Sequence, residues 1–194
     1  MEFGQPPEGE TSISVLLDKE KEKKHRGEIR KALERAINNQ LKENGFRRSG
    51  KSTWLKDSET NIEIIYLQRS QYRHSYYIEA GIYRGDTVFK DTPPTITDCR
   101  HNDRERLEYI LRDIYRKEHE GEPDVEERAE AARIRLDQAL NFEMTNDQTS
   151  HSNVEYPPSV PLQEATKKIQ IITEATRNAL PLWLEQHSSL TDNA

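Results

Sequence analysis

The chain has little apolar sequence and almost no cysteine. Of its 194 residues, 32% are hydrophobic, 7% are aromatic and 33% are charged. Such an apolar-poor composition predicts a modest core, long solvated helices and some disordered sequence within a single domain. The only cysteine, Cys99, excludes an internal disulfide and is typical of proteins from a reducing cytosol.

Long apolar runs are missing as well. No stretch approaches the roughly 20 apolar residues that cross a bilayer, and no signal peptide is recognisable, so we expect a cytoplasmic protein without membrane contact. The formal net charge of −6 makes nucleic acid an improbable partner. The charge is uneven, because residues 45–84 are mildly basic whereas the sequence after residue 102 is acidic.

Metal-ligand spacing is also lacking. Cys99 and His101 supply two ligands, whereas a structural zinc site takes four, and the other histidines show no metal spacing. We therefore expect no metal and no cofactor. The order of residues alone does not identify a Ser-His-Asp or Cys-His catalytic arrangement.

Residues 45–84 hold most of the aromatic and β-branched sequence. Alternation and turn residues predict extended segments at 46–49, 52–56, 62–68 and 74–83. Residues 62–68 are apolar on both faces, which is typical of a central strand covered on both sides. The connections are too short for crossover helices, so we expect an antiparallel meander of about four strands.

A phosphate-loop pattern lies inside this stretch. Residues 45–52 (GFRRSGKS) match G-x-x-x-x-G-K-[ST], a loop in which backbone amides and the lysine hold phosphates and the serine holds magnesium. That chemistry needs a buried strand before the loop and a helix start after it. Here a helix precedes the match and a strand follows Lys51, so we interpret the match as a β-turn and keep a nucleotide-binding enzyme as the alternative.

Helical stripes flank the sheet sequence. A helix capped by Asp18 and running to residue 44 carries an apolar stripe that should pack on the sheet, and residues 103–142 read as an acidic helical insertion. A last helix starts near residue 162, and Pro181 is expected to break it. The sequence thus predicts an α+β fold, with a flexible tail at 1–17, one domain at 18–187, a flexible loop at 145–161 and a frayed end at 188–194.

Finer signals mark the ends of these elements. The apolar patch at 13–17 is expected to dock on the domain, with an added strand or a partner contact as alternatives. Residues 95–99 suggest an edge strand, and Asn102 or Asp103 suggests the cap of the next helix. Asp124 with Glu127 resembles a capping box that would start another helix.

Basic and polar residues at the strand ends are the candidate site. Glutamine at the end of an apolar strand can bind a ligand, and clustered arginines can bind phosphate or an acidic protein surface. We expect these residues to converge, together with Tyr72 and Tyr76, on one rim of the sheet: Arg47, Arg48, Gln68, Arg69, Arg73 and His74.

Several of these segments resemble a known family. The segment 41–46, Gly50, Trp54, the strand end at 67–70 and the segment 80–83 are similar to the uncharacterised bacterial family called domain of unknown function 4304. The similarity loosens after the sheet and returns at 180–184. The resemblance implies a small α+β domain without an established activity. It also implies a turn at Gly50, because the family's glycine sits between two strands.

These observations favour an interaction module over an enzyme. We expect a cytosolic protein that binds a protein partner through the sheet rim or the acidic helices. An immunity- or antitoxin-like role is one version, because an acidic α+β protein can neutralise a basic partner by charge complementarity. The alternatives are a nucleotide-handling enzyme that uses residues 45–52 and nucleic-acid binding by the basic rim.

Overall fold

The computed structural model describes residues 8–58, 60–71, 73–85, 92–144 and 158–188, with side chains from residue 18 onward. The expectations for residues 1–7, for most of the loop at 145–161 and for the end at 189–194 lie outside this part of the chain. The elements in order are α1 (Glu8–Glu43), β1 (Arg47–Arg48), β2 (Thr53–Asp57), β3 (Ile62–Arg69), β4 (Tyr76–Tyr83), the short 3-10 turns η1 (Ile96–Asp98) and η2 (His101–Asp103), β5 (Arg104–Arg106), α2 (Leu107–Glu118), α3 (Val125–Leu140) and α4 (Leu162–Ser188).

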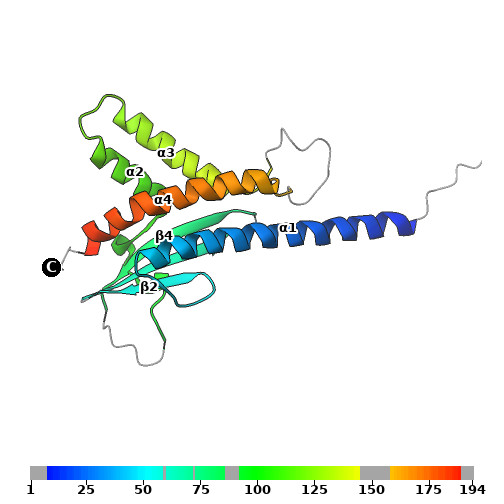
Figure 1. The fold of residues 1–194 in the computed structure, drawn as a ribbon, viewed down its shortest axis with the longest axis horizontal. Helices are drawn as coiled ribbons and strands as arrows, with labels where there is room; N and C mark the ends of the chain where they lie inside the picture. Colours follow the sequence, from blue (N-terminus) through cyan, green and yellow to red (C-terminus); the bar gives the residue numbers. More distant parts are fainter. Residues whose placement is uncertain (1–7, 59, 72, 86–91, 145–157, 189–194) are drawn as a thin grey trace, which may run out of the picture.

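The strands form one antiparallel sheet in the order β1-β2-β3-β4-β5 (Figure 1). Each strand therefore lies beside its neighbour in the sequence, which confirms the predicted meander and the α+β fold. The sheet has one strand more than the expected four, because β5 adds to the far side of β4.

β3 is the middle strand, and both of its faces are buried. Ile65 and Leu67 belong to the large core beneath the helices, while Ile62 and Ile64 belong to a small cluster on the opposite face with Ile96. Side chains alternate between the two faces of a strand, so a strand covered on both faces is mostly apolar. The buried Glu63 of β3 is paired with Lys56 at 3.1 Å. The prediction from the sequence of β3 is confirmed.

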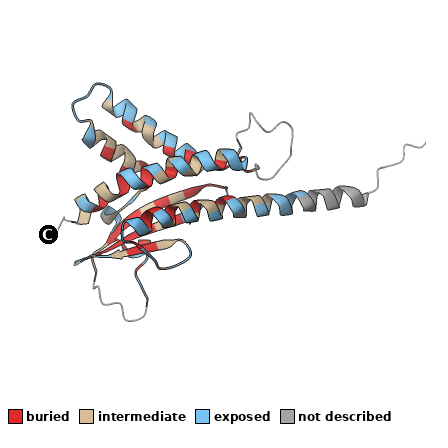
Figure 2. Cartoon of the chain, in the orientation of Figure 1, coloured by how far each residue is buried: buried red, intermediate tan, exposed pale blue. Residues whose placement is uncertain are grey.

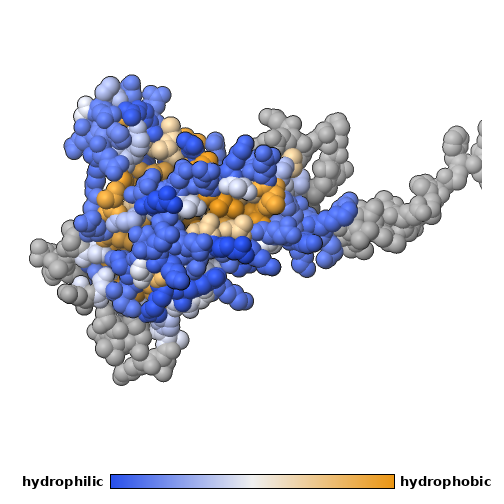
Figure 3. Space-filling view, viewed as in Figure 1, coloured by the Kyte–Doolittle hydropathy of each residue, from blue (hydrophilic) through white to orange (hydrophobic). Residues whose placement is uncertain are grey.

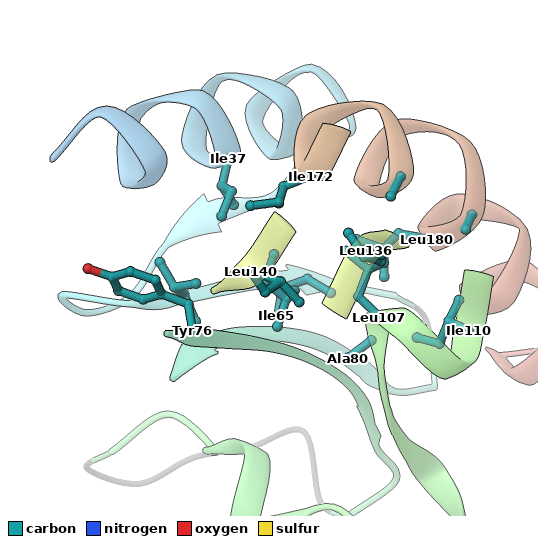
Figure 4. Packing of buried hydrophobic residues seen from close by; sticks show 14 of the residues in the cluster. Ile37, Ile65, Tyr76, Ala80, Leu107, Ile110, Leu136, Leu140, Ile172 and Leu180 are labelled. Carbon is teal, nitrogen blue, oxygen red and sulfur yellow. The ribbon is translucent and has the colours of Figure 1, made fainter. Parts of the chain in front are cut away.

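The helices cover one face of the sheet. Figure 2 shows the buried residues of α1 and α4 turned toward each other and toward the strands. In Figure 4, Ile37 of α1 and Ile172 of α4 approach each other above Ile65 of the sheet, and Leu136 and Leu140 of α3 fill the space beside them. Figure 3 shows the same apolar seam between α1 and α4 on an otherwise hydrophilic face.

Two backbone hydrogen bonds join the segments on either side of residues 145–157. The amide of Met144 donates to the carbonyl of Pro158, and the amide of Val160 donates to the carbonyl of Phe142, both at 2.8 Å. Glu143 and Ser159 consequently face each other in an antiparallel bridge. The start of α4 is thereby fixed against the end of α3.

Several predicted element boundaries were wrong. α1 begins at Glu8, ahead of the Asp18 cap, so the backbone of residues 13–17 is helical and adds no strand. The segment 95–99 contains the 3-10 turn η1, at which Thr95 and Asp98 make a capping box, and the edge strand comes later, as β5. α2 accordingly begins at Leu107 with neither Asn102 nor Asp103 as its cap.

The predicted capping box of α3 and the predicted break in α4 are also wrong. Asp124 takes a left-handed conformation with a φ of 58°, and its side chain makes no capping hydrogen bond. α4 continues through Pro181 to Ser188. Proline in a helix interior costs about 3 kcal/mol. Burial of Leu180, Trp183 and Leu184 on either side of it offsets that cost.

Candidate functional site

The backbone at Gly50 does not have the form of a phosphate loop. β1 and β2 pair antiparallel on either side of residues 49–52, and the amide of Ser49 donates to the carbonyl of Thr53 at 3.0 Å. The Arg48 guanidinium donates to the carbonyl oxygens of Gly50 and Lys51. The turn therefore presents carbonyls to its own arginine, and the residues after Lys51 form a strand in place of the helix start that phosphate binding uses.

The six residues of the predicted rim do not form one site. Arg47 pairs with Asp57 at 3.0 Å on the exposed sheet surface. Arg48 instead pairs with Glu34 of α1 at 3.2 Å and lies 5.6 Å from the centre of the Trp54 ring. These neighbouring arginines thus belong to separate ion pairs, as the alternation of a strand requires.

The other rim residues divide between the surface and the interior. Gln68 and Arg69, at the end of β3, and Arg73, in the following turn, are exposed. His74 is fully buried, and its backbone amide donates to Glu143 Oε1 at 2.8 Å. Tyr72 lies outside the described residues. The three exposed residues share the end of the sheet, whereas His74 is part of the packing beneath the helices.

His74 takes part in a buried hydrogen-bond network. Its Nδ1 lies 2.6 Å from Ser159 Oγ, and its Nε2 lies 3.3 Å from the Tyr76 hydroxyl. The Ser159 hydroxyl and amide both donate to Glu22 Oε1, at 2.6 and 2.9 Å, and Arg26 donates to the same oxygen at 2.8 Å. The network connects α1, β4 and the segment that leads into α4.

The direction of these hydrogen bonds indicates that the network stabilises the fold and does not activate Ser159 as a nucleophile. Burial alone raises the pKa of Glu22, but hydrogen bonds from Arg26 and Ser159 outweigh it and hold the pKa below its ordinary value. The Ser159 proton therefore points to the carboxylate, so His74 must donate its own Nδ1 proton to Ser159. In that arrangement the imidazole cannot remove the serine proton, as a serine nucleophile would require.

The protonation of His74 agrees with this assignment. Burial, followed by the charges of Arg26 and Arg69, lowers the pKa of His74 to about 4. A neutral imidazole with one donor and one acceptor nitrogen satisfies Ser159 and Tyr76 at once. His74 consequently stabilises the fold and is not available to a ligand.

A cleft on the opposite edge of the sheet has a different character. It has a volume of about 1050 Å³ and runs over β5 and along α2 to the last turns of α4. α2 and the carboxyl end of α4 lie at the same end of the molecule (Figure 1). Five Lys or Arg side chains, two histidines and only three carboxylates line it. We call it the edge cleft, and these charged groups are Arg104, Arg106, Arg112, Arg116, Lys117, His101, His187, Glu79, Glu105 and Asp113.

The cations of the edge cleft are only partly neutralised. Asp113 is shared, since it lies 3.0 Å from Arg112 and 3.4 Å from Arg116, and Arg116 also pairs with Glu126 of α3. Arg106 reaches Glu79 only at 3.7 Å, and Arg104 makes no ion pair with any residue that the structure describes. The cleft is therefore a positively charged surface on a chain whose net charge is −6.

Aromatic rings contact two guanidinium groups of the cleft, those of Arg106 and Arg112. Arg106 lies 4.5 Å from the centre of the Tyr77 ring. Tyr109 contacts two guanidinium groups, with Arg112 at 5.2 Å and Arg133 at 5.5 Å from its centre. Cation–π contacts restrain these long side chains. Because less side-chain entropy remains to be lost, such arginines are well suited to bind carboxylates or phosphates.

Our sequence reasoning missed this site for an identifiable reason. The sequence after residue 102 is acidic on average, and the average conceals how the charges are distributed. Arg112 and Arg116 are four residues apart and share one side of α2. Arg104 and Arg106 are two residues apart and share one face of β5. A search for basic residues at strand or helix spacing would have found both pairs.

Metal-ligand clusters and membrane-spanning helices are two other features that bear on function in the described part of the chain. It contains no group of three or more His, Cys, Asp or Glu side chains that could hold a metal ion. Among the residues that the structure describes, no helix combines the length and the apolar character that crossing a membrane requires.

Comparison with known proteins places the sheet and the β4, β5 and α2 part of the edge cleft within a family. No curated protein and no solved structure matches the chain. A family model described as Domain of unknown function (DUF4304) matches residues 37–156, which is more than half of the chain. The match takes in all five strands, α2 and α3, whereas most of α1 and all of α4 lie outside it. The chain belongs to the DUF4304 family.

Proposed function

We propose that this protein is a cytosolic interaction module that holds an acidic segment of a partner protein in the edge cleft. The observation that carries the proposal is the excess of cations in the cleft over its carboxylates on a chain of opposite net charge. Surface complementarity of this kind speeds association and selects the partner by its charge.

The dimensions and composition of the cleft favour a polypeptide. A volume of about 1050 Å³ exceeds what a single phosphate fills, and the cations extend over two different elements. Glu79, Glu105 and Asp113 interrupt them, which suits a chain of mixed side chains better than a uniform polyanion. The overall charge of −6 also repels nucleic acid at long range.

Poly-L-glutamate provides a direct test. We expect binding that weakens steeply with salt, and Arg104→Glu with Lys117→Glu should weaken it at least about tenfold, since each 1.4 kcal/mol of lost attraction is a factor of ten. The matched control is Arg69→Glu with Arg73→Glu, which changes the net charge equally at the predicted rim and should alter binding less than about twofold. Equal losses in the two double variants would refute the proposal.

The same assay separates the alternative functions. Single-stranded oligothymidine that binds the native protein as tightly as poly-L-glutamate would favour the nucleic-acid function. ATP binding that Lys51→Ala abolishes would favour the nucleotide enzyme, although the strand after Lys51 argues against it. On the present proposal neither ligand competes with poly-L-glutamate.

A second candidate surface is the tip of the α2–α3 hairpin. Six exposed carboxylates gather there, at Glu118, Glu120, Glu122, Asp124, Glu126 and Glu127. Two of them are paired, Glu122 with Arg128 and Glu126 with Arg116. The six carboxylates favour the immunity- or antitoxin-like version, in which an acidic projection neutralises a basic protein. Its test is capture of a basic protein from the host, compared with a variant that carries Gln at Glu118, Glu120 and Glu127. Capture that survives these substitutions would eliminate this version.

A further inference from the structure

We propose that the partner of the edge cleft binds as an extended strand, adding to β5 through an acid–x–acid pattern. This inference rests on the proposed function, because it specifies how the acidic segment would lie. It starts from the position of β5. In the sheet order β5 has β4 as its only neighbour among the described strands, so no described strand pairs with its other side. The amide of Arg106 already donates to Glu105 Oε1 at 2.9 Å, which leaves the backbone groups of Arg104 for an added strand. Alternate residues of an edge strand turn their N–H and C=O groups outward, where an added strand can pair with them.

The edge cleft lies over this free edge. In the β4–β5 ladder, Arg106 faces Glu79 and Arg104 faces Gly81, and residues directly opposite each other share a face of the sheet. Glu105 faces Ala80 and so points to the other face. Side chains from both faces of β5 line the same cleft. Because side chains from both faces of β5 line the cleft, the cleft must open along the edge of this strand.

Of the two β5 arginines, Arg104 has fewer described side-chain partners than Arg106. Gly81, across from Arg104, offers it no side-chain partner, and the side chains of Ile96 and Cys99 fill the space where a Cβ of residue 81 would lie. Arg106, in contrast, has Glu79 across from it at 3.7 Å. A carboxylate on an added strand would therefore gain most from Arg104, with Arg106 next.

The charges on β5 favour an acidic strand over a second copy of the chain. Antiparallel pairing of two β5 strands centred on Glu105 would place Arg104 opposite Arg106 and Glu105 opposite Glu105. Like charges directly opposite each other destabilise a strand pair. An incoming strand with acidic residues at alternate positions faces the two arginines instead, and a basic residue between them faces Glu105.

Matched peptides test the pattern. The probe is an acetylated, amidated heptapeptide Thr-Val-Glu-Lys-Glu-Val-Thr, and the control Thr-Val-Glu-Glu-Lys-Val-Thr has the same composition and net charge. We expect the alternating peptide to bind at least about tenfold more tightly, because only its two carboxylates lie on the same side of a strand. In the variant with Arg104→Glu, Glu105→Arg and Arg106→Glu the charges of β5 are reversed. This variant should bind Thr-Val-Lys-Glu-Lys-Val-Thr more tightly than Thr-Val-Glu-Lys-Glu-Val-Thr.

Backbone methylation separates strand pairing from attraction between side chains. Two forms of the probe carry N-methyl groups at odd or at even positions, so each removes one alternate set of N–H donors. One form should lose at least about tenfold in affinity and the other should lose little, because only one set faces β5. Both methylated forms binding as the parent does would overturn strand addition while leaving the proposed function intact. Poly-L-glutamate that binds while the heptapeptide does not would have the same meaning, and failure of both probes would overturn the proposed function itself.

Discussion

The two edge strands of the sheet, β1 and β5, each carry two arginine residues, yet they differ in how the arginine charges are balanced. On β1, Arg47 has Asp57 at 3.0 Å and Arg48 has Glu34 at 3.2 Å, so each cation has a close carboxylate, although Glu34 also pairs with Arg30. On β5, Arg106 has a carboxylate only at 3.7 Å, and the cations of the surrounding cleft outnumber its carboxylates. Arginine on an edge strand is therefore an ambiguous signal until its partners are known.

The comparison extends to the interior beside each edge. At the end of the sheet where the site was predicted, His74, Ser159 and Glu22 satisfy one another inside the fold. Polar groups that are satisfied internally stabilise the protein but have little left to offer a ligand. At the edge cleft the charges are balanced only in part, which is the condition that a binding surface needs.

The largest effect that would sharpen this contrast is the pH dependence from His74. The folded protein binds the imidazole proton at a pKa of about 4, whereas the ordinary value is 6.5. Between these values the unfolded chain binds more protons, so the contribution is intact above pH 6.5 and is lost as the pH falls toward 4. At 1.36 kcal/mol per unit, the loss amounts to about 3 kcal/mol.

Denaturant unfolding of the native protein and of His74→Gln, at pH values from 7 to 4, measures this contribution. The variant lacks the titrating group, so its free energy of unfolding should fall less over this range than that of the native protein. A difference between the two proteins that stays constant with pH would show that His74 titrates normally and that the network is not buried as described.

A smaller effect distinguishes the glycines beside the two edges. A Cβ at Gly81, across from β5, would lie 2.6 Å from Ile96 Cδ1 and 2.8 Å from Cys99 Sγ, so Gly81→Ala should cost about 2 kcal/mol through overpacking. A Cβ at Gly50, in the turn after β1, would lie 3.8 Å from Thr53 Oγ1, and Gly50→Ala should change stability by less than about 0.5 kcal/mol. Thermal unfolding of the two variants gives the comparison, which equal shifts would contradict.

The smallest expected effect concerns the arginines themselves. Arg48→Ala removes an ion pair to a mostly buried Glu34 and a contact with Trp54, and should destabilise the fold by about 0.5–1 kcal/mol. Arg104→Ala removes no ion pair to a described residue and should stay within about 0.5 kcal/mol of the native protein. Chemical unfolding resolves the difference, and a larger loss from Arg104→Ala would mean that Arg104 is engaged in the fold.

Much of the fold could be read from the sequence because the sheet follows simple periodicity. Alternation in β4 placed Tyr76, Ile78, Ala80 and Ile82 on one face, and the structure buries all four beneath the helices. The stripe in α1 likewise predicted its buried side, with Ile29, Leu33 and Ile37 completely buried. Short connections then permitted only antiparallel neighbours.

The remaining features depend on contacts that local sequence does not record. Pro181 reads as a helix breaker, and only the burial of its neighbours in the core explains why α4 continues. His74 reads as a surface residue after Arg73, and its burial depends on Glu22 and Ser159, which are distant in the sequence. The edge cleft joins β5, α2 and α4, so no single window of the sequence contains it.

The two backbone hydrogen bonds that join the segment 142–144 to the segment 158–160 have a practical consequence for engineering the chain. They fix the two points from which residues 145–157 depart, independently of what connects them. The closure entropy of a connection grows only by about 0.6 kcal/mol for each doubling of its length. A fluorescent protein or an affinity tag grafted at this position would therefore leave the sheet and the edge cleft assembled, giving a labelled probe that needs no fusion at Met1 or Ala194.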